Sequence, residues 1–166
     1  MCSVGDKVVC AHHGAGTIVA IEHKEVLGRP CEYFSICMFH DRMTMMIPVE
    51  NAERSGMRKV IAADAVDEVL CILRAGPSEG LSTKWHERTK RMQEKLGTGE
   101  VCAVAEVVRD IHRRGDLGAL PLGDKRLLEK ASKILIGELM CACDLDEAGA
   151  TALLDEALNG ESRESR

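Results

Sequence analysis

The chain has 166 residues, of which 45% are hydrophobic and 30% charged, and its net charge is −5. These values are ordinary for a soluble globular protein with one domain or two small ones. No apolar run approaches the roughly 20 residues of a membrane-spanning helix, and the first residues lack a signal-peptide pattern, so we expect a cytoplasmic protein with no membrane partner.

The first third of the sequence predicts β-strands. Four runs are rich in Val, Ile, Thr, Tyr, Phe and Met, and turn-like breaks with Gly, Pro or Asp separate them. The runs cover residues 7–10, 17–24, 31–39 and 43–49. The third run is apolar on nearly both faces, as expected for a strand inside a small barrel. This part of the chain therefore predicts an SH3-like or Tudor-like β-barrel, a type of module that binds other molecules.

The remainder predicts helices, because its apolar residues recur at helical spacing between Gly- and Pro-containing breaks. The expected helices cover residues 60–74, 82–96, 99–114, 121–142 and 146–158. Asp144 with Glu147 resembles a capping box at the start of the last one. The fold class is thus α+β with two small domains: a barrel at 1–56, then a compact all-α bundle of about five helices at 57–160. We expect a disordered tail at 161–166.

Residue types that carry catalysis or bind metals are present but not in the required patterns. The eight cysteines form no Cys-x2-Cys pair, and Cys141 and Cys143 have no second close pair to complete a tetrahedral site. His12 and His13 lie in a glycine-rich turn with no carboxylate pair nearby. The sequence also lacks a nucleophile elbow, a Walker lysine and a His-Glu-x-x-His motif. We therefore predict no enzyme, no catalytic residue, no metal and no cofactor.

Positive charge is concentrated in two segments despite the acidic total. Residues 84–95 carry five cations and two anions, and residues 124–133 carry four cations and two anions. Trp85, the only Trp, begins the first segment. An amphipathic ring among cations can stack on bases while the cations hold phosphates. Alternatively, Trp85 could open a buried helical stripe, which continues through Thr89, Met92 and Leu96.

A series of short motifs runs along both halves of the chain. They are Val4-Gly5-Asp6-Lys7-Val8-Val9, His12-His13-Gly14-Ala15-Gly16, Ile47-Pro48-Val49-Glu50-Asn51-Ala52, Gly56-Met57-Arg58, Trp85 with Arg88 and Lys90, Val104-Ala105-Glu106-Val107-Val108-Arg109-Asp110, Asp124-Lys125-Arg126-Leu127-Leu128 and Ile134-Leu135-Ile136-Gly137-Glu138-Leu139. In this order they resemble the CarD/CdnL family of bacterial transcription regulators over nearly the whole chain. The helical half with its Trp is the distinguishing part, because the transcription–repair coupling helicase carries a related barrel.

The resemblance implies a regulator that acts on RNA polymerase. In the family, the barrel docks on the lobe of the polymerase β subunit, and the helical domain reaches promoter DNA at the upstream edge of the transcription bubble. The Trp wedges into the minor groove there and basic side chains hold the backbone, so the open complex is stabilised without base-sequence readout. We therefore expect a monomer associated with the nucleoid through RNA polymerase, with the upstream fork of promoter DNA as its second partner.

Carried over residue by residue, the resemblance gives two candidate sites. The DNA-binding residues are Trp85, Lys84, Arg88, Lys90, Lys125 and Arg126. The polymerase-binding residues are Lys24, Met43, Met45, Met46, Ile47 and Pro48. On this view Trp85 contacts DNA, and part of its ring packs on Met92.

The sequence departs from the family pattern at three of these positions or beside them. Glu87 stands where relatives often have a second basic residue, which weakens the expected attraction for DNA. Lys24 and Met46 stand where well-known relatives have arginines. Lys24 keeps the charge without the bidentate fork, and Met46 predicts a more apolar contact.

Two other functions remain compatible with the sequence. One is a polymerase-binding module in repair or stress response, which would need the barrel but not Trp85. The other is a sensor of metal or redox state built on cysteine or histidine.

Overall fold

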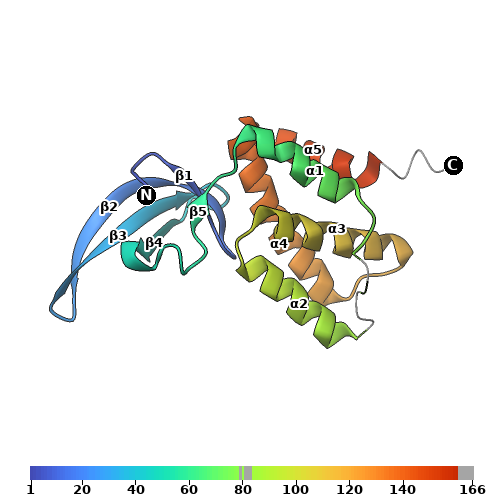
Figure 1. Cartoon of the computed structure of the whole chain (residues 1–166), viewed down its shortest axis with the longest axis horizontal. Coiled ribbons are helices and arrows are strands. Elements are labelled where there is room, and N and C mark those ends of the chain that lie inside the picture. The colour runs from blue at the N-terminus through green and yellow to red at the C-terminus, as the bar shows by residue number, and fades with distance from the viewer. Residues whose placement is uncertain (79, 81–83, 161–166) are drawn as a thin grey trace.

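The computed structural model describes residues 1–78, 80 and 84–160, and it has a β-domain followed by a helical domain (Figure 1). The strands are β1 Lys7–Cys10, β2 Gly14–Val26, β3 Arg29–Met38, β4 Thr44–Pro48 and β5 Arg58–Lys59. They form one antiparallel sheet in the order β4-β3-β2-β1-β5. The predicted α+β class, with the β-domain first, is confirmed.

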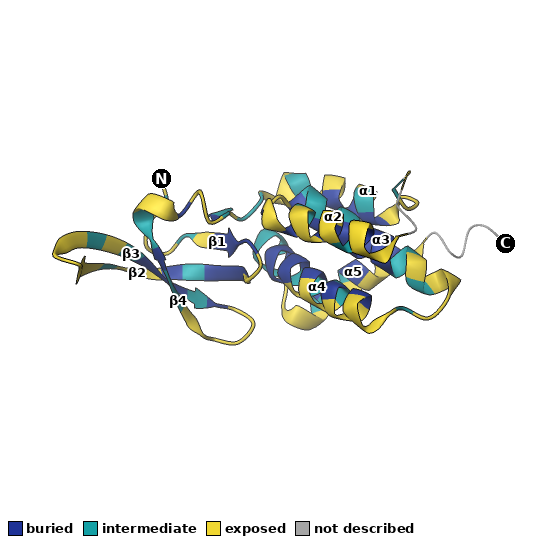
Figure 2. Ribbon diagram, turned by 90° about the horizontal axis from the view of Figure 1, so that it is seen from below, coloured by how far each residue is buried: buried dark blue, intermediate teal, exposed yellow. Residues whose placement is uncertain are grey.

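Strands β2 and β3 form a long hairpin with two different halves. Near the helices, β2 is buried, but beyond a β-bulge between Ile18 and Ala20 it becomes increasingly exposed. The hairpin reverses at Leu27 and Gly28, both with positive φ (52° and 75°), as a tight hairpin turn requires. The outer half therefore extends away from the helical domain as an exposed arm (Figure 2).

Apart from the first boundary, the described helices match the predicted ones to within three residues at each end. They are α1 Val66–Arg74, α2 Trp85–Gly97, α3 Val101–Leu117, α4 Leu122–Cys143 and α5 Glu147–Asn159. Residue 60 does not begin a helix, because β5 pairs with β1 and the chain stays extended beyond it. The sheet thus continues past the boundary expected at residue 56. The start predicted at residue 82 and the tail at 161–166 lie outside the described residues.

The core of the helical domain includes side chains from the sheet. Helix α3 packs against α1, α2 and α4, and α4 also packs against α5, β1 and β2. Strand β1 is buried on both faces: Val8 and Cys10 join the barrel core, whereas Val9 joins the helical core. Burial raises the pKa of the Cys10 thiol to about 11, so this cysteine stays protonated. The two cores therefore lie on opposite faces of the sheet at β1 and the start of β2, where Ala15 also joins the helical core.

An ion pair between Arg58 and the buried carboxylate of Glu138 holds the β-domain against α4. Glu138 is 1% exposed, and its carboxylate oxygens accept hydrogen bonds from Nη1 and Nη2 of Arg58 at 2.5 and 2.8 Å. The backbone N–H of Ile61 donates to the same carboxylate at 3.1 Å, and Nε of Arg58 donates to the Gly99 carbonyl at 2.6 Å. Beside this pair, Gly137 allows α4 to approach Ala15 closely, since a Cβ there would lie 3.2 Å from the Ala15 methyl group.

We predict that Arg58→Met lowers the free energy of unfolding by about 3–5 kcal/mol, because it leaves the Glu138 charge buried without its main partner. Lys59→Met is the matched control: it removes the same charge from the adjacent residue, whose ion pair with Asp6 is exposed, and it should change stability little. Urea unfolding followed by circular dichroism measures both. Equal effects of the two substitutions would contradict this role for the buried pair.

Candidate nucleic-acid and polymerase interfaces

Trp85 is neither a core residue nor a freely projecting one. It is the first residue of α2 and is 41% exposed. The ring lies over Gly123 in the first turn of α4, where a Cβ would be 3.1 Å from ring atom Cζ2. The His86 ring meets it edge-on at 4.7 Å between centroids. The indole therefore has one supported side and one accessible side.

Arg88, one turn after Trp85 on α2, lies in the core of the helical domain. It is 2% exposed, and its Nη2 lies 3.2 Å from Oδ2 of Asp124, which is itself buried. The buried face of α2 thus comprises Arg88, Met92 and Leu96. It differs from the stripe suggested by the sequence in its first turns, where Arg88 takes the place of Thr89 and Trp85 is exposed. The assignment of Arg88 as a phosphate contact is therefore corrected: its guanidinium joins α2 to α4 inside the domain.

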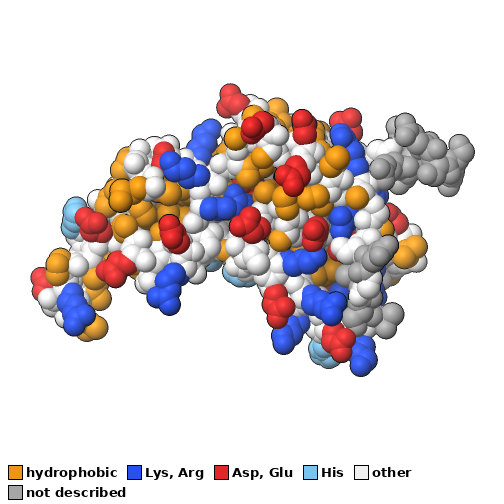
Figure 3. All heavy atoms as spheres, viewed as in Figure 1, with side chains coloured by type: hydrophobic (Ala, Val, Ile, Leu, Met, Phe, Trp, Pro, Cys, Tyr) orange, Lys and Arg blue, Asp and Glu red, His pale blue; other side chains and the backbone are white. Residues whose placement is uncertain are grey.

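The other predicted DNA-binding cations are exposed on the same two helices. Lys90 lies on α2, and Lys125 and Arg126 lie in the first turns of α4. Lys84 precedes α2, and its Nζ is 3.7 Å from the carboxylate of Glu87. Basic and acidic side chains are mixed over the helical domain on the face shown in Figure 3. The positive surface is consequently smaller than the sequence count implies.

The structure gathers Trp85 and Arg126 into one groove between α2 and α4. The groove has a volume of about 530 Å³, and its lining includes Gln93, Lys130 and His12, which the sequence did not single out as DNA-binding. Helical spacing could have indicated Lys130, one turn after Arg126. Nothing in the sequence indicated that His12 lines this groove, because His12 lies in the other domain, in the turn between β1 and β2.

The predicted polymerase-binding residues divide between the surface and the barrel core. Met43 is exposed, and Met46 and Pro48 are partly exposed. Within β4, Met45 and Ile47 alternate with Met46 and Pro48, and Ile47 is 8% exposed in the barrel core. The side chain of Ile47 is thus not on the surface, which corrects its assignment as a docking side chain. Strand β4 itself lies at one edge of the sheet.

Lys24 and Met46 meet although they are far apart in the sequence. Nζ of Lys24 lies 3.2 Å from Sδ of Met46 and 3.5 Å from a carboxylate oxygen of Glu22. The two positions carried over from the family therefore form one contact at the β4 edge. The carboxylate of Glu22 partly neutralises the positive charge of Lys24, so this part of the edge is less basic than two arginines would make it.

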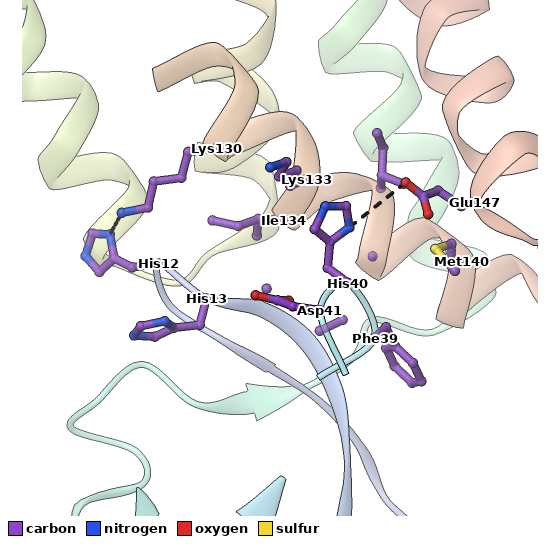
Figure 4. Close-up of a pocket in the computed structure, with 14 residues that line it drawn as sticks. His12, His13, Phe39, His40, Asp41, Lys130, Lys133, Ile134, Met140 and Glu147 are labelled. Atoms are coloured by element: carbon purple, nitrogen blue, oxygen red, sulfur yellow. Dashed lines mark hydrogen bonds and ion pairs between the residues drawn. The ribbon is translucent and has the colours of Figure 1, made fainter. Parts of the chain in front are cut away.

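A second hollow, of about 150 Å³, lies between the barrel turns and α4 (Figure 4). Nζ of Lys130 lies 3.4 Å from Nδ1 of His12, and Nδ1 of His40 lies 4.0 Å from the carboxylate of Glu147. Burial, helped by Lys130 and His13, lowers the pKa of His12, so its neutral ring can accept a hydrogen bond from Lys130. Among residues 1–78, 80 and 84–160, no group of three or more His, Cys, Asp or Glu is placed to hold a metal ion.

Comparisons with known proteins match both domains. The family model for the CarD C-terminal domain matches residues 68–155, and the model for the CarD-like/TRCF RID domain matches residues 3–61. The chain belongs to the CarD family. YdeB of Bacillus subtilis (strain 168), described as a candidate transcription factor, is 39% identical over 139 residues, which is 84% of this chain and 90% of that protein.

Membership of the CarD family gives the general function, which is transcription regulation. The two matched regions correspond to the β-domain with its β5 strand and to the helical domain from α1 into α5. No helix in the described part of this CarD family member is long and apolar enough to cross a membrane.

We predict that Arg88→Met lowers the free energy of unfolding by about 3 kcal/mol, because it leaves the Asp124 carboxylate buried with only Arg114, whose Nε is 3.8 Å away. Lys90→Met, two residues further along α2 and exposed, should change stability by less than about 0.5 kcal/mol. Urea unfolding of both variants checks this. An Arg88→Met protein as stable as the wild type would contradict the buried role of Arg88 and restore it as a candidate phosphate contact.

Proposed function

We propose that this protein binds the lobe of the RNA polymerase β subunit through its β-domain and stabilises the promoter open complex through Trp85. The observation that carries the proposal is the placement of Trp85. The only Trp of the chain stands half-exposed beside exposed cations, while a buried arginine fills the adjacent core position. A ring of that size left at the surface favours a role in binding.

The polymerase contact is assigned to the β4 edge. The family model that matches residues 3–61 is shared with the polymerase-interacting module of the transcription–repair coupling factor. An edge strand offers unpaired backbone groups to a partner sheet, so a partner strand can extend the sheet there. Met43, 64% exposed, and the Lys24–Met46 contact flank this edge and supply a mainly apolar surface with one positive charge.

The DNA contact is assigned to the N-terminal ends of α2 and α4. Trp85 presents its accessible side there, Arg126 lines the same groove, and the exposed Lys84, Lys90 and Lys125 lie in or beside the first two turns of the two helices. Such a surface suits a contact to DNA backbone with an aromatic wedge at a base step, and it reads no base sequence. Arg88 is no longer part of this surface.

The mechanism is differential binding. A wedge at the upstream edge of the bubble is favourable only after the duplex has begun to open, so the protein binds the open complex more tightly than the closed one. A difference of about 1.4 kcal/mol shifts that equilibrium tenfold. Docking on polymerase raises the local concentration of Trp85 near the fork, which compensates for weak DNA affinity in a protein of net charge −5.

We predict that Trp85→Ala removes most of the lengthening of open-complex lifetime that the wild-type protein gives on a ribosomal promoter with the cognate polymerase, and Trp85→Phe should retain part of it. Both variants should bind polymerase as the wild type does, because Trp85 is in the other domain. Full lengthening by Trp85→Ala would move the DNA contact to the cations. Absence of any effect from the wild type would favour a polymerase-binding role without DNA contact.

We also predict that Lys24→Glu combined with Met46→Glu abolishes co-purification with the isolated β lobe, because it places two negative charges on the apolar edge. The exposed position Glu25, on the same arm, offers a control: Glu25→Lys reverses a charge outside the Lys24–Met46 contact and should leave binding intact. Unchanged binding by the double variant would rule out this edge as the docking site.

A further inference from the structure

The groove between α2 and α4 runs the length of α2. Both helices pack on α3, which leaves them side by side over its surface. Trp85 stands at one end, over Gly123 of α4. His12 closes the other end, where a Cβ on Gly97 would be 3.4 Å from its Nε2. Because α2 has 13 residues, these two ends are roughly 18 Å apart.

The floor of the groove is apolar, whereas its rim is polar and positively charged. Two leucines form an apolar floor: Leu127, one turn after Gly123 on α4, lies toward the Trp85 end, and Leu96, beside Gly97, lies toward the His12 end. Arg126 and Lys130, one turn apart, stand on the α4 side, and the exposed amide of Gln93 stands on the α2 side. No Asp or Glu is among the described residues that line the groove. An occupant should therefore be flat and apolar in one part and negatively charged in another.

An unpaired nucleotide meets these requirements. Its base has two apolar faces that stack on aromatic and apolar surfaces, its edge carries hydrogen-bond donors and acceptors that an amide can match, and its phosphate pairs with Arg and Lys. The volume of about 530 Å³ is within the usual range for small-molecule sites, about 300–1,000 Å³. Duplex DNA fits less well, because paired bases cannot reach an apolar floor.

We propose that this groove receives one unpaired nucleotide of the DNA strand freed on opening, with its base between the Trp85 ring and Leu127 and its phosphate between Arg126 and Lys130. His12 of the β-domain closes the end of the site and hydrogen-bonds Lys130, so both domains contribute to it. This inference rests on the proposed function, since it requires the helical domain to lie at the edge of the bubble. It adds a second contact that only opened DNA can make.

The test uses the full-length protein, the cognate RNA polymerase and a series of promoter templates. Each template carries one abasic site at the upstream edge of the bubble, on one strand or the other, so that a base is lost while the backbone charge stays. The readout is the ratio of open-complex lifetimes with and without the protein on the same template. We expect this ratio to fall by roughly fivefold or more at one position of one strand, as the loss of one base–aromatic stack predicts, and to stay constant elsewhere.

Two lysines of α4 provide matched variants. Lys130→Gln removes a charge from the groove, whereas Lys133→Gln removes the same charge less than one turn further on, where the lysine pairs with Glu129 at 3.1 Å outside the groove. On unmodified promoter DNA, Lys130→Gln should reduce the lifetime ratio about threefold or more, and Lys133→Gln should leave it unchanged.

The outcomes separate this inference from the proposed function. If Trp85→Ala abolishes the lengthening but no abasic position changes the ratio, the proposed function stands and the groove does not bind a base. The same conclusion follows if Lys130→Gln weakens the effect without any abasic position doing so, because Lys130 is then a contact to duplex phosphate. If the wild-type protein does not lengthen the lifetime on any template, both proposals fail.

Discussion

The buried carboxylate of Glu138 is the constraint on which the arrangement of the two domains depends. Burying a charge to 1% exposure is costly unless its oxygens are hydrogen-bonded, and here the donors are Arg58 in β5 and the backbone of Ile61 just after it. These donors come from the β side and the acceptor from α4. Sliding or rotating one domain on the other would leave the carboxylate unpaired, whereas apolar contacts alone would tolerate small shifts.

Helix α4 consequently connects the two candidate interfaces as a rigid element. Its 22 residues are roughly 33 Å long; Gly123 near one end supports Trp85, and Gly137 and Glu138 further along meet the β-domain. In the proposed function, the position of the polymerase-bound barrel thus sets the position of Trp85 at the fork. With a fixed geometry of this kind, forming the first contact raises the effective concentration of the second, so two weak contacts together give strong binding.

The sequence predicted the positions of most helices and strands, but it did not predict which charged side chains are buried. Apolar periodicity located the five helices of the described residues, and runs rich in Val, Ile, Thr, Tyr, Phe and Met between turn-like breaks located the four longer strands. The bounds of the last helix were predicted correctly, but its cap was not: Asp146 is the N-cap and accepts from Gly149, whereas Asp144 ends α4 with φ of 54°. The family resemblance placed Arg88 among the DNA contacts, and nothing in the local sequence indicated its burial, because its partner Asp124 is 36 residues away and only the tertiary fold brings the two together.

Under the proposed function, the burial of Arg88 changes what kind of DNA contact the protein is suited to make. With one cation buried and Lys84 close to Glu87, few side chains remain to neutralise phosphates. An interface with few phosphate contacts has low affinity for duplex DNA and a weak dependence on salt. The binding energy must then come mainly from stacking and shape, which closed duplex DNA does not offer. Under the proposed function, the weak positive surface is therefore what makes the protein discriminate between open and closed DNA, because strong phosphate binding would stabilise both states alike.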